Sequence, residues 1–187
     1  MDIKNIEVIQ GDALEKLKFV TSNLKNYKIT GNIPYYITGK LLRIISELEN
    51  KPKLTVLTIQ KEVAERITAQ PPHMNLLAAA VQYWAQPKII FTLKPTNFSP
   101  PPKVESAVIK LENKEQKPEI ENSDNFYKFI HIIFKQPRKT LVNNLRSGTK
   151  LPLKNIENML KNLKIDEKAR PQDLSLEQIK KIASLFT

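Results

Sequence analysis

The chain has 187 residues, 41% of them apolar, which is enough for one domain or for one domain with a small appendage. No apolar run reaches the roughly 18–20 residues of a membrane span, no signal-peptide pattern opens the chain, and the lack of cysteine excludes disulfides and thiolate metal sites. We therefore expect a reducing, cytoplasmic location. The net charge of +11 indicates a polyanionic partner, although a solvated lysine-rich surface would give the same total.

The first part of the chain alternates predicted strands with predicted helices. The predicted strands are residues 6–9, 28–30, 54–59, 89–93 and 107–111. The predicted helices are residues 41–48, 61–68 and 76–85. The 54–59 run is β-branched and largely apolar, as in a buried parallel strand. This alternation predicts an α/β sheet within residues 1–112.

The last part of the chain changes to a helical period. Residues 113–124 are polar and charged and are predicted to be a linker. Residues 125–187 are predicted to be a small all-α domain. Its last helix is expected to open with a capping box at Ser175 and Gln178.

A tetrapeptide, Asn32-Ile33-Pro34-Tyr35, follows the 28–30 strand at its C-terminal end, where α/β enzymes place their chemistry. The Asn32 amide oxygen and the Ile33 carbonyl could accept both hydrogens of the exocyclic amine of adenine, which would direct the nitrogen lone pair at a methyl donor. Pro34 would fix the backbone, and Tyr35 would stack on an extruded base. An ordinary strand-to-loop turn is the alternative interpretation.

Two further segments have both a functional and a structural interpretation. Asp12 could bind a nucleoside, or it could cap a helix. The loop from Phe98 to Ser106 contains three successive prolines; it could present Phe98 as a second aromatic wall and Lys103 as a phosphate contact, or it could merely connect two strands. His73 and His131, the only histidines, form no metal constellation, and His131 is predicted to be structural.

Positive charge is concentrated in one stretch of the chain. Between Asp124 and Glu157 no residue is acidic. The basic residues of this stretch, which we call the basic window, are Lys128, Lys135, Arg138, Lys139, Arg146, Lys150 and Lys154. The window, together with Lys103, predicts an RNA-binding surface.

Taken together, these segments resemble the ribosomal RNA adenine dimethyltransferases. The resemblance rests on Gly11-Asp12-Ala13-Leu14, the tetrapeptide, residues 60–66, residues 98–106, Arg138-Lys139-Thr140-Leu141 and residues 170–175, in the family's order and spacing. It implies a Rossmann-like class I methyltransferase sheet followed by a small helical domain. It also implies S-adenosylmethionine as cofactor, bound by Asp12, Ala13 and Asn32. Tyr35 and Phe98 would hold the target adenine, and Lys103, Lys135, Arg138, Lys139 and Arg146 would contact RNA.

Two branches of that family share these features. One dimethylates adjacent adenines of small-subunit rRNA during ribosome biogenesis; the other acts on large-subunit rRNA and confers macrolide resistance. Residues 60–63 and 170–175 favour the first. The resemblance also implies that the first strands and the glycine-rich donor loop would precede residue 1, since none of the four glycines forms a G-x-G. The chain alone is therefore expected not to bind the donor, and a catalytically inactive rRNA-binding protein is the alternative.

Overall fold

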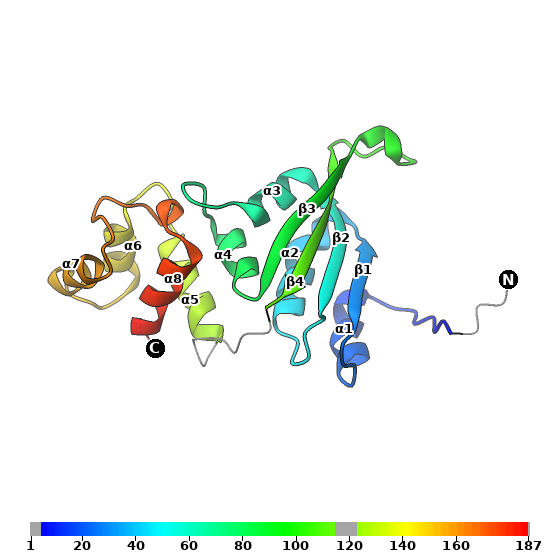
Figure 1. Ribbon diagram of the computed structural model, residues 1–187, viewed down its shortest axis with the longest axis horizontal. Coiled ribbons are helices and arrows are strands. Elements are labelled where there is room, and N and C mark those ends of the chain that lie inside the picture. The colour runs from blue at the N-terminus through cyan, green and yellow to red at the C-terminus, as the bar shows by residue number, and fades with distance from the viewer. Residues whose placement is uncertain (1–4, 115–122, 187) are drawn as a thin grey trace.

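The computed structural model describes residues 5–114 and 123–186. Its centre is a mixed four-stranded sheet (Figure 1) with the strand order β1-β2-β4-β3. The strands are β1 (Lys28–Asn32), β2 (Leu54–Gln60), β3 (Ala85–Leu93) and β4 (Ser106–Asn113). β1 and β2 are parallel, whereas β4 runs antiparallel to both β2 and β3. The predicted α/β class is confirmed.

The strand directions bring the two predicted parts of the active site to one edge of the sheet. Asn32 and Gln60 end the parallel strands β1 and β2 at this edge. Ser106, which begins β4, pairs with Gln60, and Leu93, which ends β3, pairs with Ser106. The loop of residues 94–105 therefore leaves the sheet at the edge where β1 ends. We call this the carboxyl edge.

Four helices belong to this part of the chain: α1 (Ala13–Thr21), α2 (Thr38–Ser46), α3 (Lys61–Thr68) and α4 (Leu76–Gln82). The apolar stripe of α2 is buried with the alternate residues of β2 and β4 that point inward. Leu57, Ile59, Ile109 and Leu111 are all 0–1% exposed. Burial of this kind, at about 25 cal/mol per Å² of apolar surface, is the main stabilising contribution to such a core.

The predicted strand at residues 6–9 is absent: these residues are irregular. Ile6, Val8 and Ile9 are 62%, 89% and 48% exposed. The strand predicted from the alternation of apolar and polar residues is therefore wrong here. A strand forms only with a hydrogen-bonding neighbour, and none of the described strands pairs with this segment.

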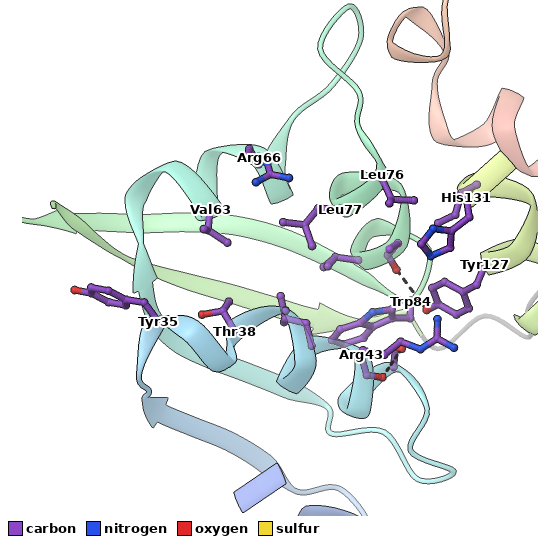
Figure 2. A pocket seen from close by; sticks show the side chains of 16 residues that line it. Tyr35, Thr38, Arg43, Val63, Arg66, Leu76, Leu77, Trp84, Tyr127 and His131 are labelled. Atoms are coloured by element: carbon purple, nitrogen blue, oxygen red, sulfur yellow. Dashed lines mark hydrogen bonds between the residues drawn. The ribbon is translucent and has the colours of Figure 1, made fainter. Parts of the chain in front are cut away.

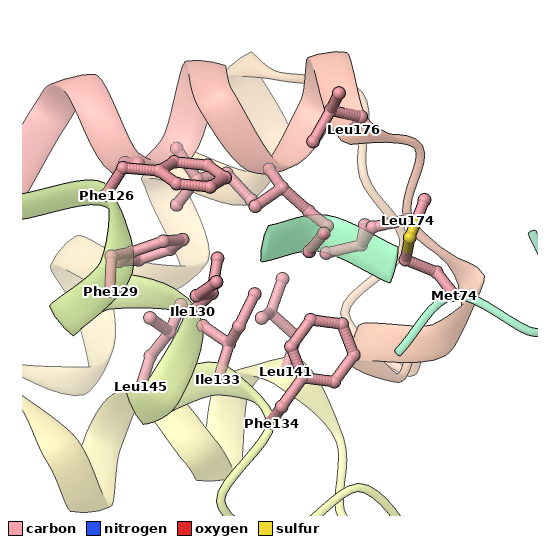
Figure 3. Packing of buried hydrophobic residues seen from close by; sticks show 14 of the residues in the cluster. Met74, Phe126, Phe129, Ile130, Ile133, Phe134, Leu141, Leu145, Leu174 and Leu176 are labelled. Atoms are coloured by element: carbon pink, nitrogen blue, oxygen red, sulfur yellow. The ribbon is translucent and has the colours of Figure 1, made fainter. Parts of the chain in front are cut away.

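The C-terminal part is helical, as predicted, with α5 (Ser123–Ile133), α6 (Leu141–Gly148), α7 (Leu153–Asn162) and α8 (Leu176–Ala183). Figure 3 shows its core, built around Phe126, Ile130 and Leu145, each 0% exposed. Met74, from the segment before α4, lies beside Leu174 in this core. α4 thus shares its buried surface with the helical part. The predicted linker, residues 113–124, lies mostly outside the described residues.

One local prediction in the helical part can be compared with the structure. The capping box is confirmed: the Gln178 amide donates to Ser175 Oγ at 3.2 Å, and the Ser175 amide donates to Gln178 Oε1 at 2.9 Å. α6 (Leu141–Gly148) begins directly after its N-cap Thr140, whose side chain accepts from the Asn143 amide at 3.3 Å. Among the described residues, no helix is long and apolar enough to cross a membrane.

Gly148, the last residue of α6, is expected to tolerate no side chain. A Cβ added there would overlap Ile132 Cγ2 and lie 3.3 Å from Ile132 Cβ, and the β-branched Ile132 side chain has few rotamers in which to move aside. Gly148→Ala should therefore lower the free energy of unfolding by about 1–3 kcal/mol, measured by urea denaturation. Gly39→Ala is the matched control, because a Cβ there meets no atom within 4 Å. Equal stability of the two variants would contradict the prediction.

Candidate active site and RNA-binding surface

The tetrapeptide leaves two hydrogen-bond acceptors free at the carboxyl edge. Asn32, the last residue of β1, is exposed, and within the described residues neither its side chain nor the Ile33 carbonyl has a hydrogen-bond partner. Pro34 has φ −57° and ψ 133°, and its carbonyl accepts from the Ile37 amide at 3.2 Å. The chain thus turns into the short helix η1 (Tyr35–Ile37) directly after the two free acceptors.

Tyr35 is anchored by a residue distant in sequence, at the start of β4. Its hydroxyl forms a 2.6 Å hydrogen bond with Ser106 Oγ. Ser106 is wholly buried at the start of β4, whereas Tyr35 is half-buried. The orientation of the Tyr35 ring is therefore fixed by tertiary structure. Because the ring is already ordered, binding a ligand against it carries no further cost in side-chain entropy.

The substitution Tyr35→Phe separates the contribution of the Tyr35 hydroxyl from that of its aromatic ring. The substitution keeps the ring but leaves the buried Ser106 hydroxyl without its partner. It should lower the free energy of unfolding by about 1–3 kcal/mol in denaturant titration. Tyr36→Phe is the control, since Tyr36 is 89% exposed and should change stability by less than about 0.5 kcal/mol. A Tyr35→Phe protein as stable as the control would show that the bond contributes nothing.

Phe98 lies on the loop that leaves the same edge. It caps the short helix η2 (Pro95–Asn97), its amide donates to the Pro95 carbonyl at 3.1 Å, and its side chain is half-buried. Within the described residues, the rings of Phe98 and Tyr35 do not stack on each other. Tyr35 follows the end of β1 and Phe98 lies on the loop that leaves the same edge, and their roles in binding a base stay predictions.

The far end of this loop is tied to α3. Lys61 Nζ lies 2.7 Å from Glu105 Oε2, and the Lys61 amide donates to the Glu105 carbonyl at 3.0 Å. The hydrogen bond between these two side chains raises the pKa of Lys61 and lowers the pKa of Glu105. Both side chains are exposed, so this pair contributes to loop position more than to stability.

Asp12 is the N-cap of α1, as its structural interpretation predicted. One carboxylate oxygen accepts from the Leu14 amide at 2.8 Å. Lys18 lies near the C-terminal end of α1, and Glu47 directly follows α2. Lys18 Nζ lies 3.2 Å from Glu47 Oε2. This ion pair brings the C-terminal ends of α1 and α2 together, and the two helices are in contact.

The side-chain oxygens of Asp12 and Asn32 suit part of a nucleoside-containing cofactor. Asp12 and Asn32 are exposed, and their unoccupied oxygens are acceptors for hydroxyl or amine groups. A glycine-rich turn that would cradle the rest of such a ligand is not present in the 187 residues. Donor binding by Asp12, Ala13 and Asn32 stays a prediction.

The basic window gathers four of its residues on one exposed turn and helix. Lys135, Arg138, Lys139 and Arg146 are all exposed, and no described acidic side chain forms a salt bridge with them. The side chain of the buried Asn144 holds the turn in place. It accepts from the Gln136 amide at 3.0 Å and donates to the carbonyls of Gln136 and Thr140 at 3.0 and 3.1 Å. Lys103 is separate, on the loop of residues 94–105 between β3 and β4.

His131 was predicted to be structural within an apolar helix, but it is not buried. It is exposed on α5 and lines a cavity of about 480 Å³ where α2, α3, α4 and α5 meet. Its position lies off the apolar stripe of α5 formed by Phe126, Phe129 and Ile130, so the helical period contained the signal. Among the described residues, no group of three acidic or histidine side chains could hold a metal ion.

Comparison with known proteins decides the family. The sequence matches the family described as "Ribosomal RNA adenine dimethylase" over residues 2–187. The chain belongs to this family. It is 36% identical over 188 residues to "Ribosomal RNA small subunit methyltransferase A" of Clostridium botulinum, covering 97% of this chain and 67% of that protein. A protein of the same name from Lactobacillus acidophilus is 35% identical over 180 residues, with 95% and 60% covered.

Solved structures agree with the fold of a ribosomal RNA adenine dimethylase. A dimethyladenosine transferase from Plasmodium falciparum superimposes with a TM-score of 0.79 at 26% identity, over 98% of this chain and 72% of that one. The 23S rRNA methyltransferase ErmE gives a TM-score of 0.70 at 20% identity, over 96% and 71%, which shows the shared fold. The predicted resemblance and the Rossmann-like fold are confirmed. The chain spans about 60–67% of the length of the two curated relatives above.

Proposed function

We propose that this dimethylase-family chain carries the target-base site and the RNA-binding surface for N6,N6-dimethylation of adjacent adenines in small-subunit rRNA, with S-adenosylmethionine as methyl donor. The observation that carries the proposal is the pair of free acceptors, Asn32 Oδ1 and the Ile33 carbonyl, beside the anchored Tyr35. The pre-ribosomal small subunit would be the partner and the cytoplasm the location.

The chemistry follows from the amine of adenine, which is a poor nucleophile because its lone pair is delocalised into the ring. Two acceptors aimed at the two N–H bonds favour a tetrahedral nitrogen whose lone pair points at the methyl group. The anchored Tyr35 supplies a fixed face for the extruded base. The site needs no acid or base of unusual pKa, because orientation of the reactants supplies most of the effect. S-adenosylmethionine, when bound, supplies the electrophilic methyl group.

The choice of rRNA is tested by binding. We expect the 187-residue chain to bind a fragment from the 3′ end of small-subunit rRNA at least about tenfold more tightly than a large-subunit fragment of equal length, a difference of about 1.4 kcal/mol. Filter binding at fixed salt measures both. Tighter binding of the large-subunit fragment would favour the macrolide-resistance type of enzyme and contradict the proposal.

A further inference from the structure

The cavity at the junction of α2, α3, α4 and α5, which we call the junction cavity, shares only Tyr35 with the site described above. Figure 2 shows that it runs from Tyr35 at one end to Tyr127 and His131 at the other, with Trp84 and Leu77 between them. Its volume of about 480 Å³ lies within the range of about 300–1,000 Å³ typical of ligand pockets. A largely apolar wall with a few converging polar groups is also typical of such pockets.

The charge of the junction cavity selects an anionic ligand. Arg43, which is paired with Glu47, and Arg66 line it, and none of its described lining residues is acidic. His131 adds ring nitrogens that can form a hydrogen bond to an anion. Arg66 is exposed and forms no salt bridge with a described residue. Arg66 is thus available to an anion at the mouth of the cavity.

Arg43 and Tyr127 build the far wall of the cavity. The Arg43 guanidinium lies 4.4 Å from the centre of the Tyr127 ring, and its Nε donates to Glu47. The Tyr127 hydroxyl reaches the Ala80 carbonyl at 3.5 Å, and burial raises its pKa. These contacts hold the Tyr127 ring and the Arg43 cation in fixed positions at this end of the cavity.

Gly39 provides an independent observation. It lies in the first turn of α2 and lines the junction cavity, and it is the one glycine of the four at which a Cβ would meet no atom within 4 Å. Neither packing nor a left-handed backbone requires glycine at this position, and alanine would be the better helix former. Since Gly39 lines the cavity, a large side chain at this position would have room to occupy it.

We propose that the junction cavity takes an unstacked nucleotide of the rRNA substrate, adjacent in sequence to the adenine held at residues 32–35; this rests on the proposed function. Aromatic and apolar walls suit the base, and Arg66 and His131 suit its phosphate. Continuity with Tyr35 brings the nucleotide within reach of the strand that presents the target. Splayed bases stacked on aromatic side chains are the usual means of recognising single-stranded RNA.

Trp84 gives the test a direct signal, because it is the only tryptophan of the chain and lines the cavity. The probe is a single-stranded oligoribonucleotide that contains the two adjacent adenines and their small-subunit flanks. It is titrated against Trp84 fluorescence and, in parallel, in filter binding. We expect a saturable change in emission. Gly39→Phe, which fills the cavity, should weaken binding of the oligonucleotide at least about tenfold. Asn158→Phe adds the same ring at an exposed position on α7 and should leave the affinity unchanged.

Arg66→Gln provides a second variant that does not depend on tolerating a bulky residue. It should weaken binding and reduce the slope of log K against log salt by about 1. Oligonucleotide binding by filter assay with no change in Trp84 emission, or unchanged affinity in both variants, would overturn the cavity assignment alone. Absence of oligonucleotide binding would overturn the proposed function as well. If 5′-AMP saturates Trp84 emission while the oligonucleotide does not change it, the ligand is a free nucleotide and the RNA assignment is wrong.

Discussion

Asn32→Ala is expected to reduce methyl transfer to rRNA by at least about 100-fold, the size of effect that follows from losing the orientation of a reacting group. The variant removes one of the two acceptors for the adenine amine and leaves the Ile33 carbonyl and the Tyr35 ring in place. Rates are measured with a fusion that supplies a glycine-rich donor segment ahead of residue 1, with radiolabelled S-adenosylmethionine and a small-subunit fragment. The loss should appear in kcat, because base stacking is retained.

The fold should survive this change. Asn32 is exposed at the end of β1, and its side chain bonds to no described residue, so stability should change by less than about 0.5 kcal/mol. Thr30→Ala is the matched control, since Thr30 is exposed on the same strand two residues earlier. If Asn32→Ala methylates as fast as Thr30→Ala, the tetrapeptide is only a turn and the proposed base site is wrong.

Reversing Arg138 and Lys139 to Glu is expected to weaken rRNA binding by at least about tenfold. If each residue neutralises one phosphate, the slope of log K against log salt should fall by about 2. Both side chains are exposed on the turn that Asn144 holds, and no described salt bridge is lost with them. Filter binding of a small-subunit fragment over a salt series measures both quantities.

The control makes the same change in net charge elsewhere. Lys161 and Lys168 are exposed in the helical part but lie outside the basic window. Their double reversal to Glu should weaken binding less and leave the salt slope closer to that of the unmodified chain. Equal losses in the two double variants would mean that RNA senses only the total charge of +11, and the window would then have no special role.

Local sequence determined much of this structure. The strand predicted at residues 54–59 is β2 (Leu54–Gln60), the helix predicted at 61–68 is α3 (Lys61–Thr68), and the capping box opens α8. Each depends on side chains close together in the chain, through periodicity or through bonds over three residues. The motifs that identify the family are also local, which is why the sequence predicted the family before any tertiary contact was known.

Tertiary structure decided what depends on partners distant in sequence. Residues 6–9 have the alternation of a strand but no described strand to pair with, so they are irregular. Tyr35 is fixed by Ser106, 71 residues away, and the basic turn is held by the buried side chain of Asn144. The junction cavity, with Gly39 at its open wall, exists only because α2, α3, α4 and α5 converge there. Periodicity predicts which face of a helix is apolar, but only the packed chain determines where the faces fail to meet.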